Sequence, residues 1–102
     1  MVQDGFIVRT ISGDKATIVN VCDAELIGKT VKGDGLEMKI SSDYFGGELT
    51  DSAGALELIR KSDIANLVGK RIVDLVIDGE LATEEAVRNV GGTAFLMIYR
   101  FS

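Results

Sequence analysis

Carboxylates are the main side chains of this sequence that could do chemistry, because the chain has no histidine and a single cysteine. Without imidazole there is no Ser-His or Cys-His pair for nucleophilic catalysis. One cysteine also falls short of the roughly four ligands that a tetrahedral zinc site needs. The chemistry left open is that of carboxylates, lysines and tyrosines, or none, and the sequence predicts no cofactor.

Two carboxylates, Asp23 and Glu25, lie two positions apart after an apolar segment. Two carboxylates in different surroundings can divide the roles of acid and base, or bind a metal ion together. The alternative is that Asp23 caps a turn of the chain while Glu25 is solvated. A second acidic group, made of Asp43, Glu48 and Asp51, could hold Mg²⁺ through oxygen ligands or form a solvated loop.

Cys22 stands at the end of an expected strand, just before a helical turn whose dipole could lower the pKa of a thiol. The neighbouring carboxylates of Asp23 and Glu25 oppose thiolate formation, and no histidine can act as its base. We therefore expect Cys22 to be a small buried apolar side chain rather than a nucleophile.

A short loop combines two aromatic residues with two glycines: Tyr44, Phe45, Gly46 and Gly47. Aromatic rings with close backbone approach can stack the bases of single-stranded RNA. Three lysines that could contact phosphates lie nearby in sequence: Lys29, Lys32 and Lys39. The alternative is an aromatic plug over the core, with the glycines enforcing a turn.

Glycine pairs elsewhere do not indicate nucleotide binding. Gly91 and Gly92 belong to no GxxxxGK[ST] pattern, and no GxGxxG follows a strand. Ala65, Asn66 and Gly69 are expected to allow close packing between helical turns, with Asn66 satisfying backbone groups locally.

The composition is that of one globular domain of 102 residues, with 46% hydrophobic and 26% charged residues. The net charge of −5 makes blanket attraction to nucleic acid improbable, although a local lysine stripe could still bind phosphates. Apolar runs fall far short of the ~20 residues of a membrane helix, and the first residues do not resemble a signal sequence. We therefore expect a cytoplasmic protein without a membrane partner.

The first half of the chain predicts strands. Residues 6–11 and 16–22 are β-branched segments around a turn-forming stretch, so they should pair as an antiparallel hairpin. Asp23 should cap a short turn at residues 24–27, and residues 36–40 alternate apolar and charged side chains as a half-buried strand does.

The second half predicts helices. Thr50 or Asp51 should cap a helix that runs to about Lys61. Residues 64–68 are expected to form a helical turn, and residues 72–79 a helix, with a strand at 72–77 as the alternative. Thr83 should start a last short helix that Gly91 and Gly92 stop, and residues 94–101 should form a final strand, which could pair with a second copy at a sheet edge. The prediction is a single compact α+β domain with a mostly antiparallel sheet and two to four short helices in its second half.

Four glycine-fixed blocks occur in order along nearly the whole chain: residues 22–29, 44–49, 64–69 and 90–92. In this order and spacing they resemble an uncharacterised archaeal family, the domain of unknown function numbered 424. The resemblance implies no established activity, only genes that tend to lie near translation genes. Where the family is expected to show proline and histidine after the last glycines, this chain has Thr93, Ala94 and Phe95, so no histidine role carries over.

Two hypotheses follow for the function. The first is a non-enzymatic binding module that docks on RNA or a ribonucleoprotein through the lysines, Tyr44 and the glycine loop. The second is a small carboxylate enzyme or divalent-metal binder built on Asp23, Glu25 and Glu48. A protein-only adaptor is a third possibility, which the sequence does not separate from the first. The candidate binding residues from all these patterns are Asp23, Glu25, Lys29, Lys32, Lys39, Tyr44, Gly46, Gly47, Glu48 and Asn66.

Overall fold

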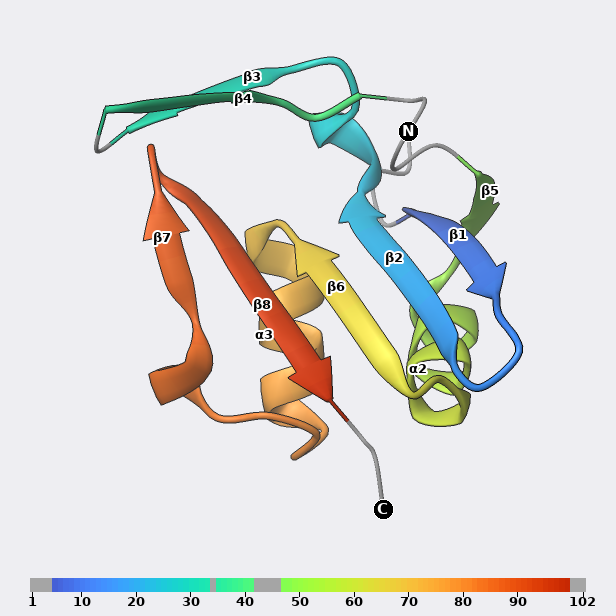
Figure 1. The fold of residues 1–102 in the computed structure, drawn as a ribbon. Coiled ribbons are helices and arrows are strands. Elements are labelled where there is room, and N and C mark those ends of the chain that lie inside the picture. Colours follow the sequence, from blue (N-terminus) through green and yellow to red (C-terminus); the bar gives the residue numbers. More distant parts are fainter. Residues whose placement is uncertain (1–4, 34, 42–46, 100–102) are drawn as a thin grey trace.

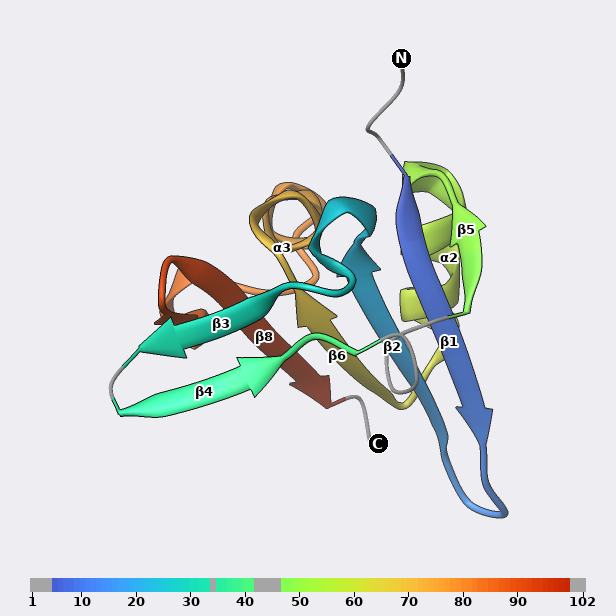
Figure 2. The same ribbon diagram turned by 90° about the horizontal axis from the view of Figure 1, so that it is seen from above.

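The computed structural model describes residues 5–33, 35–41 and 47–99. A six-stranded sheet carries two α-helices on one face, and a two-stranded hairpin lies on the opposite side of the sheet, across one end (Figure 1). Seen from above, the helices and the hairpin are separated by the sheet (Figure 2). The elements in chain order are β1 (Phe6–Ser12), β2 (Thr17–Asp23), the 3-10 turn η1 (Ala24–Leu26), β3 (Thr30–Gly33), β4 (Leu36–Lys39), β5 (Glu48–Thr50), α2 (Ser52–Lys61), β6 (Ile64–Val68), α3 (Lys70–Asp78), the 3-10 turn η2 (Glu84–Ala86), β7 (Arg88–Val90) and β8 (Thr93–Tyr99).

The sheet has the strand order β5-β1-β2-β6-β8-β7. All neighbours are antiparallel except β2 and β6, which run parallel at its centre. The architecture is therefore α+β with a mostly antiparallel sheet and both α-helices in the second half of the chain, as the sequence predicts.

The main core lies between the sheet and the helices. Side chains alternate between the two faces of each strand, so every second residue of β1, β2, β6 and β8 points towards α2 and α3. The largest fully buried members of this core are Val19, Val21, Ile59, Leu67, Ile72 and Val76.

A smaller core lies beneath the hairpin β3–β4, on the other face of the sheet. Its buried members are Cys22, Val31, Ile40 and Val68. The tip of the hairpin meets the β7–β8 turn so closely that a Cβ on Gly33 would lie 2.5 Å from the Gly91 nitrogen. This backbone contact holds the hairpin against the end of the sheet.

Several expected elements are confirmed. Strands β1 and β2 form the predicted hairpin. Strand β4 covers most of the predicted strand at residues 36–40, but its four residues are all exposed, so the expected half-burial is wrong. Helix α2 begins after Asp51, whose Oδ1 accepts a 2.8 Å hydrogen bond from the Gly54 nitrogen. Residues 70–78 form α3, so helix rather than strand is right for that segment.

The helical turn expected at residues 64–68 is wrong, because the segment is β6, a strand with neighbours on both sides. This strand has apolar residues on both faces, and so it lacks the alternation of apolar and polar side chains by which strands are recognised. Ala65 and Leu67 pack on the helix side, and Val68 on the hairpin side.

The short helix expected after Thr83 is also wrong beyond a single turn. Only residues 84–86 are helical, as η2, and residues 88–90 then pair with β8. Gly91 and Gly92 have φ angles of 58° and 80°, which suit the two-residue turn of a β-hairpin rather than the end of a helix. Strand β8 consequently lies between β6 and β7 instead of at a sheet edge.

Candidate binding surface

Asp23 is a helix cap, although for a different element from the one expected. Its side chain forms no cap of η1. Its Oδ2 accepts a 2.9 Å hydrogen bond from the Arg71 nitrogen, and its Oδ1 accepts one of the same length from the Ile72 nitrogen, both in the first turn of α3. Burial raises the pKa of the Asp23 carboxyl above its usual range, and these N–H donors oppose the rise. Both oxygens of Asp23 thus join β2 to α3.

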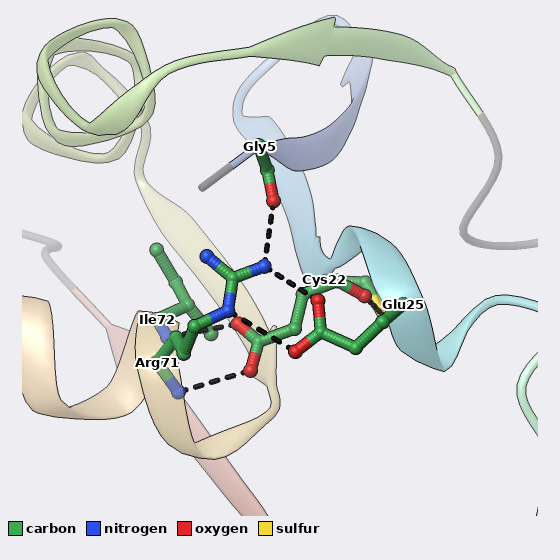
Figure 3. A network of polar contacts seen from close by, with 6 residues as sticks. Gly5, Cys22, Glu25, Arg71 and Ile72 are labelled. Carbon is green, nitrogen blue, oxygen red and sulfur yellow. Dashed lines mark hydrogen bonds and ion pairs between the residues drawn. The ribbon is translucent and has the colours of Figure 1, made fainter. Parts of the chain in front are cut away.

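Glu25 forms an ion pair with Arg71 rather than being simply solvated. The Arg71 Nη2 lies 2.5 Å from Glu25 Oε1 and also donates to the Gly5 carbonyl oxygen at 2.9 Å. Figure 3 shows the guanidinium between these two partners. The hydrogen bond from Arg71 lowers the pKa of the Glu25 carboxyl. The same guanidinium lies 4.7 Å from the ring centroid of Phe6.

These contacts give the carboxylate pair a structural role. Within residues 5–33, 35–41 and 47–99, no three histidine, cysteine, aspartate or glutamate side chains gather as a metal site would require. Glu48 lies on β5, and β1 separates it from Asp23 on β2. The structure therefore does not bring together the three carboxylates of the enzyme hypothesis.

Cys22 is fully buried, as expected. Burial, together with the charges of Asp23 and Glu25, raises the pKa of its thiol to about 12. A thiol with such a pKa remains protonated near neutral pH and is a poor nucleophile.

The structure brings the three candidate lysines onto one hairpin. Lys32 and Lys39 lie on β3 and β4, on the hairpin face turned away from Val31 and Met38, and Lys29 directly precedes β3. All three are exposed, and Glu37 is the cross-strand neighbour of Lys32. Lys32 and Lys39 thus share one face of the hairpin with Glu37, whereas Lys29 lies opposite the buried Ile40.

Of the aromatic and glycine loop that was expected beside these lysines, the structure describes only Gly47 and the Glu48 that follows it. Tyr44 and Gly46 lie outside the described residues. Gly47 packs against β1, where a Cβ would meet the Val8 carbonyl oxygen at 2.0 Å, and Glu48 begins β5 at the sheet edge. Gly47 and Glu48 therefore belong to the β5 edge of the sheet rather than to the hairpin.

A second surface emerges from the strand register, on the sheet face opposite the helices. We call this surface the open face. It consists of the strand residues that alternate with the helix-facing core: Ile7, Arg9, Ile11, Ile18, Asn20, Cys22, Leu49, Ile64, Asn66, Val68, Arg88, Val90, Thr93, Phe95, Met97 and Tyr99. The hairpin covers one end of this face, while Ile11, Met97 and Tyr99 are 40%, 49% and 63% exposed.

The balance of charge differs between the two sides of the sheet. Among the described strand residues of the open face, the charged side chains are Arg9 and Arg88, and none is a carboxylate. The helix side and its connections carry charges of both signs, with carboxylates on Glu57, Asp74, Asp78, Glu80, Glu84 and Glu85 and cations on Arg60, Lys61, Lys70 and Arg71. A chain with a net charge of −5 thus presents one cationic and largely apolar face.

A cavity of about 380 Å³ opens between the hairpin and the open face. Met38 of the hairpin lines it from one side, and Phe95 and Met97 of β8 from the sheet. Ala86 and Arg88 line it at the β7 side, so the cavity combines apolar walls with a cation.

Two asparagines meet beside this cavity. The Asn66 Nδ2 donates a 2.9 Å hydrogen bond to the Oδ1 of Asn20 on the neighbouring strand, and Asn66 also lines the cavity. The Asn20 Nδ2 and the Asn66 Oδ1 are shielded from solvent and have no hydrogen-bond partner. An unpartnered buried polar group typically costs about 1–3 kcal/mol. Because the Asn66 side chain bonds to Asn20 on the neighbouring strand, the expectation that it satisfies local backbone groups is wrong.

A comparison with models of protein families shows which family the chain belongs to. Residues 10–101 match the family described as a protein of unknown function, DUF424. The chain belongs to the DUF424 family. No curated protein matches this DUF424 chain.

A solved structure has the same fold as this DUF424 protein. The crystal structure of an uncharacterized conserved protein from Methanopyrus kandleri aligns with a TM-score of 0.80 over 96% of this chain and 95% of that one. The two sequences are 20% identical, so the likeness concerns the fold alone. None of the helices described here is long and apolar enough to span a membrane.

Sequence reasoning misses most of the open face of the DUF424 protein. Arg9, Arg88 and Tyr99 come from three strands that are distant in sequence, and only the sheet order places them on one side. The available signal was the alternation along β8, where Phe95, Met97 and Tyr99 occupy every second position. This alternation identifies the open face only when it is known which of the two sets of positions faces the helices.

Proposed function

We propose that this DUF424 protein is a non-enzymatic binding module that holds single-stranded RNA against the open face of its sheet. The observation that carries the proposal is the composition of this face, whose described strand residues combine arginines and exposed apolar side chains with no carboxylate. Such a face suits a partner that is anionic along its backbone and flat and apolar elsewhere.

A single strand of RNA has both properties. Proteins bind it by pairing cations with its phosphates and by placing its unstacked bases on aromatic or apolar side chains. Arg9 on β1 and Arg88 on β7 are four strand spacings apart, or roughly 19 Å, at about 4.8 Å per spacing. Between them Met97 and the ring of Tyr99 are exposed, so the phosphate and base contacts alternate across the face.

The hairpin lysines extend the cationic area beyond the sheet. Lys29, Lys32 and Lys39 are exposed, with Lys32 and Lys39 on the hairpin face turned away from Met38 and the cavity. The carboxylates of the helix side repel phosphates and thereby favour approach to the open face. An RNA partner also agrees with the link to translation that the family resemblance implies.

Fluorescence anisotropy with a short, labelled single-stranded RNA tests the proposal. We expect binding at about 50 mM salt that weakens strongly by about 200 mM. Arg88→Glu should weaken binding by about tenfold or more, because a cation at the phosphate path is replaced by an anion. Arg60→Glu makes the same charge change at an exposed position of α2 and should change the affinity much less.

Two results would contradict the proposal. One is a lack of RNA binding at low salt by a protein whose circular dichroism and melting temperature are normal. The other is an equal loss of RNA affinity in the Arg88→Glu and Arg60→Glu variants, which would mean that RNA is attracted to the protein without binding to one face. Purification of the tagged protein from its host tests the alternative function, that of a protein adaptor. A protein partner that is retained after nuclease treatment would indicate an adaptor.

A further inference from the structure

The cavity beneath the hairpin differs from the rest of the open face because it is hollow and contains unusually polarisable side chains. Resting on the RNA-binding function proposed above, we infer that this cavity takes one unstacked nucleobase of the bound strand, with the base edge at Asn66 and the adjoining phosphate at Arg88. The cavity would then be the point where the module reads a base rather than only a backbone.

The lining has the composition that an aromatic heterocycle needs. Both internal methionines of the chain, Met38 and Met97, line the cavity together with Phe95. Thioether sulfur makes favourable contacts with aromatic rings, and its flexible chain adapts to rings of different size. Met38 and Met97 are 40% and 49% exposed, so a bound ring would cover apolar surface that now contacts water.

The dimensions and the position of the polar groups agree with a small planar ligand. A volume of about 380 Å³ lies within the range of small-molecule sites, which combine apolar walls with a few polar groups. Because Met38 belongs to the hairpin and Met97 to the sheet, a ring would enter between two separate elements. Arg88 is exposed beside the cavity and can reach a phosphate outside it.

Asn66 supplies the group that would recognise the base. Its Nδ2 is bonded to the fully buried Asn20, which leaves its Oδ1 without a hydrogen-bond donor. An amide oxygen accepts from the amino or ring N–H groups at the edge of a base. Since this oxygen is shielded from solvent in the free protein, the Asn66 amide turns towards the cavity when the base enters.

The test uses the whole protein with nucleoside 5′-monophosphates, and with ribose 5-phosphate as the ligand that lacks a base. Methyl resonances of Met38 and Met97, labelled with ¹³C, should shift on addition of the nucleotides because of the ring current of the base. Ribose 5-phosphate should leave them nearly unchanged. The affinities of the four nucleotides should differ, because their base edges differ in hydrogen-bond donors.

A cavity-filling variant separates the cavity from the rest of the face. Ala86 is exposed and lines the cavity, so Ala86→Phe should fill it without altering a charge. We expect this variant to lose the nucleotide-induced shifts and to bind the short RNA about tenfold more weakly. Ala53→Phe, at an exposed position of α2, is the matched control and should behave like the unmodified protein. If Ala86→Phe is unstable, Met38→Ser removes the hairpin wall, with the exposed Leu36→Ser as its control.

The outcomes distinguish this inference from the proposed function. RNA binding that is normal in Ala86→Phe, or nucleotides that bind no better than ribose 5-phosphate, would overturn the base pocket and leave RNA binding intact. A failure of the unmodified protein to bind RNA at all would overturn the proposed function, and the base pocket with it.

Discussion

Asn20 and Asn66 are the residues whose placement is hardest to explain by folding alone. They share one hydrogen bond in an otherwise apolar region and leave one donor and one acceptor without partners. Buried polar atoms are satisfied in the great majority of cases, so an exception calls for a reason. Use of the amide by a ligand is such a reason, and it implies that the pair lowers stability in the free protein.

Substitution of this pair separates stability from function. In Asn66→Val the Asn20 amide loses its remaining partner, and the free energy of unfolding should fall by about 1–3 kcal/mol. In the double variant Asn20→Val and Asn66→Val no polar group remains, and stability should return to that of the unmodified protein or exceed it. Urea unfolding measures both changes, and nucleotide binding should be lost in both variants. A double variant less stable than the single one would show that the pair is needed for folding.

At the scale of elements, Arg71 joins the start of α3 to η1 and to the beginning of β1. Its ion pair with Glu25 is half exposed, and the Asp23 carboxylate caps the same helix turn from β2. The two carboxyls have pKa shifts of opposite sign. Glu25 therefore contributes stability that is present above its ordinary pKa and is lost as the pH falls through its lowered folded-state value. Asp23, whose pKa is raised, acts in the reverse direction, so stability gains from its protonation as the pH falls.

Because the two contributions oppose each other, the difference between variants is more informative than a single pH curve. Glu25→Gln should lower the free energy of unfolding at pH 7 by about 0.5–1 kcal/mol, a modest amount because the pair is partly exposed. The loss should shrink towards zero as the pH falls through the lowered folded-state pKa of Glu25, where the unmodified side chain also becomes neutral. Chemical denaturation at several pH values measures this difference. Glu57→Gln, in the exposed pair with Lys61, is the control and should have a smaller effect, while a loss independent of pH would contradict the ion-pair explanation.

Local sequence signals predicted the elements that depend on local rules. The β1–β2 hairpin, the Asp51 cap of α2 and the amphipathic α3 each follow from turn residues, a capping residue or a helical period. Strand β6 did not follow, because its apolar residues stand on both faces and give no alternation of apolar and polar positions.

Long-range pairing explains the other differences between sequence and structure. Asp23 looked like a cap for the adjacent turn, yet its oxygens bind nitrogens 48 and 49 residues later. Residues 88–90 became a strand because β8 pairs with them. The hairpin lysines could be predicted as a group because they are close in sequence. The residues of the open face could be predicted only from the order of all six strands in the sheet.

At the scale of the whole molecule, the sheet divides the charges. Among the residues that the structure describes, Arg9, Arg88, Lys29, Lys32 and Lys39 lie on the open face and the hairpin, while the helix side carries more carboxylates than cations. An overall charge of −5 therefore does not describe what an approaching polyanion meets. The contact should involve few phosphates, because the acidic side cannot take part in binding.

The salt dependence of RNA binding measures how many phosphates are neutralised. For single strands each neutralised phosphate contributes about −0.7 to the slope of log K against log salt, so the five described cations named above would together give a slope of about −3.5. We expect a measured slope between about −2 and −3.5, because Glu37 lies opposite Lys32 and reduces its share. Lys32→Glu should weaken binding at low salt and make the slope shallower by about 0.7 or more, and Lys61→Glu on α2 should leave it unchanged. A slope steeper than about −5 would mean that cations of the helix side also contact RNA, which the segregation of charge does not allow.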